Sequence, residues 1–185
     1  MSKQASSIHI SLLSYICKNE ALYVLWGILL IVLTSQISIP LKPVPITLQT
    51  FGVMLVGLTF TRTAAIKAIA GYLALGLLGL PVFANFGSGY HYLLGPTGGY
   101  LVGFLVSVAI MSSIRPFLHN QNFFCIAVNC LIGTVVILTL GIVRLSHFIG
   151  FEKAIYSGLL PFIFPGIVKA LLLALTVRYL KLNRT

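Results

Sequence analysis

Residues 68–114 read AIAGYLALGLLGLPVFANFGSGYHYLLGPTGGYLVGFLVSVAIMSSI and contain no Asp, Glu, Lys or Arg. One membrane-spanning helix needs about 20 apolar residues, so this stretch is far too long for a single helix. Proline, glycine, asparagine and serine gather in its middle, over residues 79–99, and such clusters mark turns and loops. The stretch therefore predicts two membrane-spanning helices joined by a loop.

The whole chain has the composition of an integral membrane protein. Of its 185 residues, 58% are hydrophobic and 8% are charged, whereas soluble domains carry about 25% charged residues. Twelve Lys and Arg against two acids give a net charge of +10. These basic residues stand singly at the ends of apolar runs and form no patch with interleaved aromatic residues, so we expect no nucleic-acid partner. They are typical instead of orientation signals and headgroup contacts at a bilayer.

The charged residues divide the chain into six apolar runs. We therefore predict an all-α integral membrane fold, a bundle of six transmembrane helices forming a single membrane domain over residues 1–185. The first run is longer than the apolar core of a signal peptide and no A-x-A cleavage site follows it, which favours a membrane span. The predicted spans cover residues 21–39, 45–61, 64–80, 96–114, 123–143 and 155–179, approximately.

An even number of spans places both termini on one side of the membrane. The positive-inside rule favours cytoplasmic termini, because that side then holds the larger share of Lys and Arg. We expect a multi-pass protein of the plasma (inner) cell membrane. The predicted inner segments hold Lys3, Lys18, Arg62, Lys67, Arg115, Arg178, Lys181 and Arg184, and the outer segments hold Lys42, Arg144 and Lys153.

A turn precedes the fourth predicted span, at GPTGGY (residues 95–100). The Gly95-Pro96 pair predicts this turn, because proline fixes its own φ and disfavours helix in the residue before it. We expect the hydroxyl of Thr97 to cap the helix that follows.

Two glycines begin that helix. Gly98 and Gly99 leave backbone N–H groups uncovered at its positive end, where they can donate to a carbonyl or a carboxylate. On this interpretation, valine at either position impairs ligand binding more than expression. Gly99 and Gly103 also form a G-x-x-x-G pair that lets a neighbouring helix approach closely, so a packing role without any ligand stays open.

The loop before the turn is rich in aromatic residues. It offers flat apolar faces and polar edges to a ligand, although an interfacial aromatic belt would explain its tyrosines equally well. The candidate residues here are Phe83, Asn85, Phe86, Tyr90, His91 and Tyr92. With no second ligand at a useful spacing, His91 predicts no metal site. We also find no motif for catalysis or nucleotide hydrolysis and predict no catalytic residue.

The last predicted span contains a lysine. Lys169 lies nine residues before Arg178, or ~14 Å along a helix, close to the middle of a ~30 Å hydrocarbon core. We expect Pro161, Pro165 and Gly166 to break the helix just before it. The two acids of the chain, Glu20 and Glu152, flank the spans, so no acid in the membrane can pair with Lys169. Either the side chain snorkels to the interface or a ligand supplies the anion.

Four segments together resemble the BioY family, the membrane-embedded substrate-binding (S) components of biotin uptake systems of the energy-coupling-factor (ECF) type. The likeness extends from about Gln36 to Ala170. The segments are PVPITLQTFGVMLVGL (43–58), LGLLGLPVFA (75–84), GPTGGYLVGF (95–104) and PFIFPGIVKA (161–170).

The resemblance implies a six-helix protein that binds biotin from outside, in a pocket closed by outer loops, without a cofactor. It implies that the loop around Asn85 and the turn over residues 95–100, including Thr97 and Tyr100, line the pocket, with Lys169 as a polar contact. It also implies a transmembrane coupling protein and two cytoplasmic ATPases as partners.

The chain departs from the family pattern in two places. The family motif usually reads Pro-Gly-Asp-x-x-Lys, and Gly166 stands where that Asp is expected. The first span lacks the A-x-x-x-A face that usually meets the coupling protein, since it has only Ala21 and Gly27 as small apolar residues. We therefore expect contact with the coupling protein to be weaker than in typical members or spread over other small-residue faces, with Ala64 and Ala68 as one candidate. Two alternatives remain, an S component for another small vitamin or carboxylate and a ligand-free structural membrane subunit.

Overall fold

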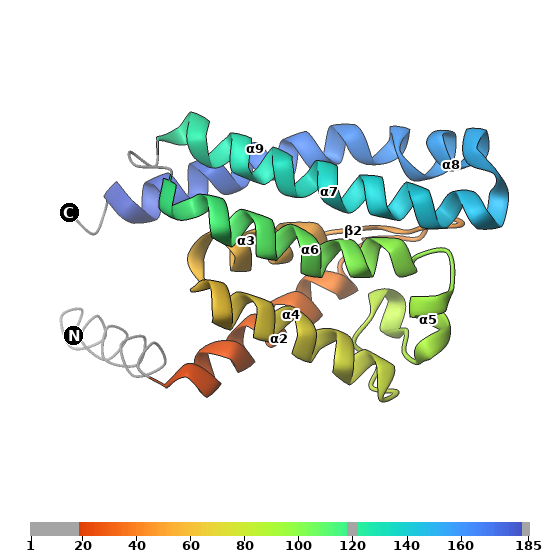
Figure 1. The fold of residues 1–185 in the computed structure, drawn as a ribbon, viewed down its shortest axis with the longest axis horizontal. Helices are drawn as coiled ribbons and strands as arrows, with labels where there is room; N and C mark the ends of the chain where they lie inside the picture. Colours follow the sequence, from red (N-terminus) through yellow and green to blue (C-terminus); the bar gives the residue numbers. More distant parts are fainter. Residues whose placement is uncertain (1–18, 118–121, 183–185) are drawn as a thin grey trace, which may run out of the picture.

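The structure, a computed structural model, describes residues 19–117 and 122–182, with side chains up to residue 179. Among the predicted inner positions, Lys3, Lys18 and Arg184 lie outside the described residues. The chain is mostly helical (Figure 1). Its helices are α2 (Glu20–Gln36), α3 (Gln49–Thr59), α4 (Arg62–Leu77), α5 (Tyr90–Leu94), α6 (Gly98–Ile114), α7 (Phe123–Ile149), α8 (Phe151–Gly158) and α9 (Leu160–Leu182), with single 3₁₀ turns η1 (Ala84–Phe86) and η2 (Arg115–Phe117).

The helices pack around α6, which contacts α7, α4 and α3. Figure 1 shows α7 and α9 side by side on one flank of α6, and α2 with α4 on the other. We call the end at which α2 and α4 begin and α6 and α9 finish the basic end. The opposite end, which holds the connections between α2 and α3, α4 and α6, and α7 and α9, is the loop end.

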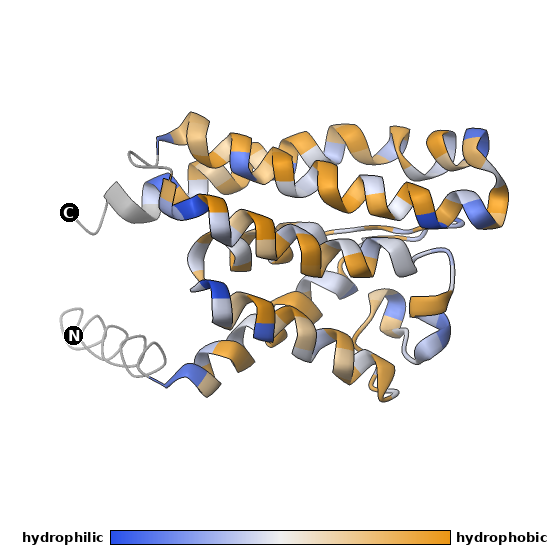
Figure 2. Cartoon of the chain, in the orientation of Figure 1, coloured by the Kyte–Doolittle hydropathy of each residue, from blue (hydrophilic) through white to orange (hydrophobic). Residues whose placement is uncertain are grey.

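Apolar residues occur along the whole length of the helices (Figure 2). Large apolar residues are exposed along whole helices, for example Leu25, Leu29 and Leu33 on α2 and Leu172 and Leu175 on α9. Soluble proteins rarely expose contiguous apolar surface of this extent, whereas a lipid-facing surface requires it. The exterior is therefore that of a membrane protein.

Three helical segments within the described residues are long and apolar enough to cross a membrane, namely Gly98–Phe117, Phe123–Ile149 and Phe151–Tyr179. The helices α2 and α3 are apolar but shorter. Each of the six predicted spans overlaps one of the helices α2, α3, α4, α6, α7 and α9. The mostly helical membrane fold is thus as predicted. Six crossings are more than helix length and composition alone support.

A short β-hairpin, absent from the prediction, joins α2 to α3. Its strands β1 (Ser38–Ile39) and β2 (Ile46–Thr47) pair antiparallel. The first span was predicted to continue to residue 39 and the second to begin at residue 45. Both helices are shorter, and Pro40, Pro43 and Pro45 disfavour helix at the residues before them, so the segment between the two helices is extended.

The predicted break in the last span is wrong. Helix α9 continues from Leu160 to Leu182 with Pro165 inside it. Pro161 lies in the first turn, where the N–H that proline lacks would have no helical partner anyway. Pro165 removes one further hydrogen bond without ending the helix.

The predicted docking edge at Ala64 and Ala68 is also wrong, because both side chains are buried inside the bundle. They lie on the face of α4 that packs against α2, and a Cβ added at Gly27 would come within 2.9 Å of the Cβ of Ala68. These small residues let α2 and α4 approach each other closely. They are not available to a partner protein.

Candidate functional site

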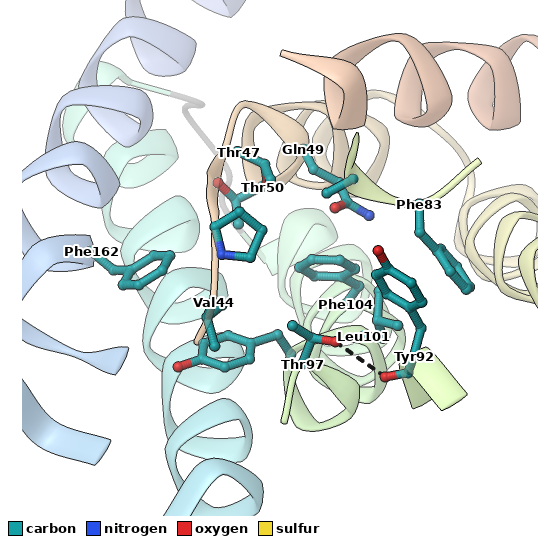
Figure 3. Close-up of a pocket in the computed structure, with 13 residues that line it drawn as sticks. Val44, Thr47, Gln49, Thr50, Phe83, Tyr92, Thr97, Leu101, Phe104 and Phe162 are labelled. Atoms are coloured by element: carbon teal, nitrogen blue, oxygen red, sulfur yellow. Dashed lines mark hydrogen bonds between the residues drawn. The ribbon is translucent and has the colours of Figure 1, made fainter. Parts of the chain in front are cut away.

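A cavity opens near the loop end of the bundle, between the hairpin, the start of α3, the η1 loop and the first turns of α6 (Figure 3). We call it the main cavity. It has about 520 Å³ of space not filled by atoms, its open mouth included. Its lining consists of Val44, Pro45, Thr47, Gln49, Thr50, Phe83, Ala84, Tyr92, Thr97, Tyr100, Leu101, Phe104 and Phe162.

Aromatic rings form most of the wall of the main cavity. Phe83 is almost fully buried, and its ring centroid lies 5.5 Å from that of Tyr72 and 5.5 Å from that of Tyr92. The rings of Tyr100 and Phe162 stack with centroids 5.9 Å apart. Such contacts fix the rings in place, so the cavity offers preformed flat faces to an apolar ring.

Polar groups enter the main cavity from the start of α3. The buried Gln49 donates from Nε2 to the hydroxyl of Tyr72 at 2.7 Å. Thr47 and Thr50 lie on the same short segment. Behind them, Lys169 donates from Nζ to the carbonyl oxygen of Thr47 at 2.5 Å and to Oγ1 of Thr50 at 3.0 Å. The cavity is therefore apolar with a few fixed polar groups, as is usual for sites that bind small organic molecules.

A second cavity, which we call the outer cavity, adjoins the first. The two share Pro45, Ala84, Tyr92 and Thr97, and the outer cavity also includes Asn85 and His91. It is more open than the main cavity, and a larger share of its wall is polar. A molecule entering the main cavity from the loop end would pass through it.

The structure brings together five of the ten predicted site residues around these two cavities. Phe83, Tyr92, Thr97 and Tyr100 line the main cavity, and Asn85 lines the outer cavity.

Two other predicted rings lie away from the cavities. The exposed fractions of Phe86 and Tyr90 are 71% and 70%, and neither residue lines the main or the outer cavity. Lys169 lines a third hollow, on the other side of the hairpin, and reaches the main cavity only through Thr47 and Thr50.

The predicted cap by Thr97 is wrong. Its hydroxyl makes no hydrogen bond to the start of α6 and donates instead to the carbonyl oxygen of Tyr92 at 3.1 Å (Figure 3). This bond ties α6 to the end of the aromatic loop. Thr97 therefore holds two walls of the main cavity together.

The glycine pair at the start of α6 is buried by packing. A Cβ added at Gly98 would overlap the carbonyl oxygen of Leu93, and one added at Gly99 would overlap the carbonyl oxygen of Leu140 on α7. Neither glycine lines the main cavity. The geometry thus gives both glycines a role in close backbone approach.

Several residues that line the main cavity were not predicted from the sequence. Thr47, Gln49 and Thr50 are polar residues within an apolar run, which is the signal that could have identified them. Phe104 and Phe162 carry no such signal, because they look like ordinary apolar residues of a span. Over the described parts of the chain, no group of three or more His, Cys, Asp or Glu residues could hold a metal ion.

Comparison with known proteins gives a consistent result over nearly the whole chain. The sequence model of the BioY family matches residues 3–184. The chain is 38% identical to "Biotin transporter BioY" of Thermotoga maritima, over 84% of this chain and 93% of that protein. It is 42% identical to "Probable biotin transporter BioY" of Pyrococcus horikoshii, over 77% and 85% of the two chains. A protein of the same name from Rickettsia prowazekii is 36% identical, over 85% of this chain and 81% of that protein.

The fold is also similar to a solved structure. A crystal structure of the S-component for biotin from an ECF-type ABC transporter superposes with a TM-score of 0.79 at 28% sequence identity. The match covers 88% of this chain and 90% of that chain.

Proposed function

The chain belongs to the BioY family, and from this premise we propose that it binds biotin in the main cavity and serves biotin uptake as the S component of an ECF-type transporter. The observation that carries the proposal is the agreement of the family match over residues 3–184 with the fold match to a biotin S-component. Members of this family are transporter components and not enzymes, and biotin is the transported ligand, not a cofactor.

The chemistry of biotin suits the main cavity and its surroundings. Biotin has an apolar bicyclic ring, a ureido edge with N–H and C=O groups, and a carboxylate at the end of an alkyl chain. The rings of Phe83, Tyr92 and Tyr100 would cover the apolar part, with Thr97 joining two of the walls. The amide of Asn85 offers both a donor and an acceptor, which suits the ureido edge.

The remaining predicted residues enter the proposal in other roles. Lys169 supplies the positive charge for the carboxylate, through the polar wall at Thr47 and Thr50. Phe86 and Tyr90 cover the outer side of the loop, and Gly98 and Gly99 let α6 approach its neighbours closely enough to form the cavity wall.

The proposed topology has six membrane crossings in the plasma (inner) cell membrane, with both termini in the cytoplasm. The helices α2 and α9 respectively begin and end at the basic end (Figure 1). That end holds Arg62, Arg115 and Arg178. The positive-inside rule supports a cytoplasmic basic end and a loop end that faces outward.

Binding of tritiated biotin to the purified protein in detergent tests the proposal. We expect saturable binding that unlabelled biotin displaces, because the cavity is preformed. Absence of saturable binding by folded protein would leave a structural membrane subunit as the function. Stronger displacement by a different vitamin or carboxylate would instead indicate an S component for that ligand, and Gly166 in place of the family Asp is the feature that makes this comparison necessary.

We expect transport of biotin against its concentration gradient to require partner proteins. The proposed partners are a transmembrane coupling protein and two cytoplasmic ATPases. Secondary transporters move ions through intramembrane acids or histidines, and both acids of this chain lie at helix starts. In sealed vesicles, we expect the chain alone to bind biotin without concentrating it. Concentrative uptake by the chain alone that a protonophore collapses would contradict an ATP-dependent mechanism.

A further inference from the structure

The turn between residues 83 and 87 has an unusual backbone. Asn85 and Phe86 both have a φ of 56°, in the left-handed region. Across them, the amide of Gly87 donates to the carbonyl oxygen of Ala84 at 3.1 Å. Two consecutive residues of positive φ within such a bond are typical of a type I′ turn, which favours Gly, Asn or Asp. Phenylalanine is unfavourable there, so the surrounding structure must hold the turn in place.

The side chain of Gln36, the last residue of α2, binds this turn from both sides. Its Oε1 accepts from the backbone N–H of Phe86 at 3.0 Å. Its Nε2 donates to the carbonyl oxygen of Phe83 at 3.1 Å, with a longer contact of 3.4 Å to that of Val82. The bond that closes the turn does not use the N–H of Phe86, so Gln36 satisfies a donor that the turn itself leaves free. One amide group thus holds the residues before and after Asn85.

The same turn forms part of the wall of both cavities. Phe83 and Ala84 line the main cavity, and Ala84 and Asn85 line the outer cavity. Gln36 lines neither of them. A second contact, from the first residue of β1, supports the arrangement, because Oγ of Ser38 donates to Oδ1 of Asn85 at 2.8 Å.

We propose that Gln36 is a positioning residue for the ligand site. It holds the turn in its left-handed conformation and thereby fixes the wall shared by the two cavities before the ligand enters. The effect on biotin rests on the proposed function, whereas the effect on the turn does not.

Substitutions of Gln36 can remove both of its hydrogen-bonding groups or only the donor. Gln36→Leu has a similar size and removes both, and we expect it to weaken biotin binding at least tenfold, since the turn is no longer held. Gln36→Glu keeps an acceptor for the N–H of Phe86 but loses the donor to Phe83, so its loss should be intermediate. Parent-like affinity in Gln36→Leu would overturn the proposal.

A second substitution distinguishes positioning from a general effect on α2. Glycine adopts positive φ without a Cβ penalty, so Phe86→Gly should let the turn form without help from Gln36. We expect the loss caused by Gln36→Leu to shrink at least threefold when it is measured in the Phe86→Gly background. An equal loss in both backgrounds would mean that Gln36 acts on something other than the turn.

Hydrogen exchange on the ligand-free protein tests the turn without biotin. In Gln36→Leu, the amides of residues 82–89 should exchange faster than in the parent, while those of α6 and α7 should not change. Unchanged exchange over residues 82–89 would overturn the proposal even if the parent binds biotin. If the parent fails to bind biotin but the exchange effect is seen, the proposed function is wrong and the role of Gln36 in holding the turn is right.

Discussion

Alanine at Gly99 should strongly destabilise the folded protein. The added Cβ would overlap the carbonyl oxygen of Leu140 and come within 2.5 Å of the Cβ of Arg144, both on α7. One turn further along α6, a Cβ at Gly103 would lie 3.0 Å from the Cα of Ile137, so the two helices are in backbone contact along this edge. A backbone carbonyl cannot rotate out of the way, and the helices would have to separate. We expect a loss at the upper end of the usual range for overpacking, about 3 kcal/mol.

Thermal unfolding and the yield of monodisperse protein in detergent measure this effect. Gly57→Ala is the matched control, because a Cβ at Gly57 would have its nearest neighbour, the Cβ of Met111, at an ordinary 3.5 Å. That variant should fold and bind as the parent does. If Gly99→Ala is as stable as Gly57→Ala but fails to bind biotin, the uncovered N–H groups at the start of α6 serve the ligand after all.

The positions of the main helices could be predicted because lipid requires long uncharged runs, which are visible in the sequence. The direction in which each helix faces could not. The sequence around Ala64 and Ala68 is apolar on all sides, so it does not tell a lipid-facing edge from one packed against α2. The strands β1 and β2 are too short to show any alternation of polar and apolar residues. Pro165 was predicted to end the helix because proline lacks the N–H that a helix interior uses. The sequence alone does not show that α9 continues through it.

The candidate site, too, could be predicted only in part. Phe83, Tyr92, Thr97 and Tyr100 lie in or beside a loop whose glycines and proline stand out from the apolar background. Phe104 and Phe162 are brought to the same cavity only by the packing of α6 and α9, which no local pattern encodes. Gln36 was missed because its role depends on backbone atoms fifty residues away.

Among the described residues, the amine of Lys169 has no ionic partner. Its Nζ donates to two neutral oxygens, those of Thr47 and Thr50. The chain contains two acids. Glu20 is paired with Lys67 at 2.6 Å near the basic end, and Glu152 begins α8 at the loop end. A charged group in the membrane is costly unless it is paired or faces a cavity. Because Thr47 and Thr50 line the main cavity, a carboxylate bound there would be the missing partner.

Lys169→Met should therefore weaken biotin binding by about 1–3 kcal/mol, or roughly 5- to 150-fold, the range for losing a charge-assisted hydrogen bond. Methionine keeps most of the length of the side chain and removes its charge. Lys67→Met is the control, since Lys67 is exposed and lies near the basic end, far from the cavities.

The decisive measurement compares biotin with biotinamide, which has no negative charge. If Lys169 pairs with the carboxylate, the parent should bind biotinamide more weakly than biotin, and Lys169→Met should bind both equally. An equal loss for both ligands would show that Lys169 acts only by holding Thr47 and Thr50 in place, and unchanged affinity for biotin in folded Lys169→Met would remove it from the site.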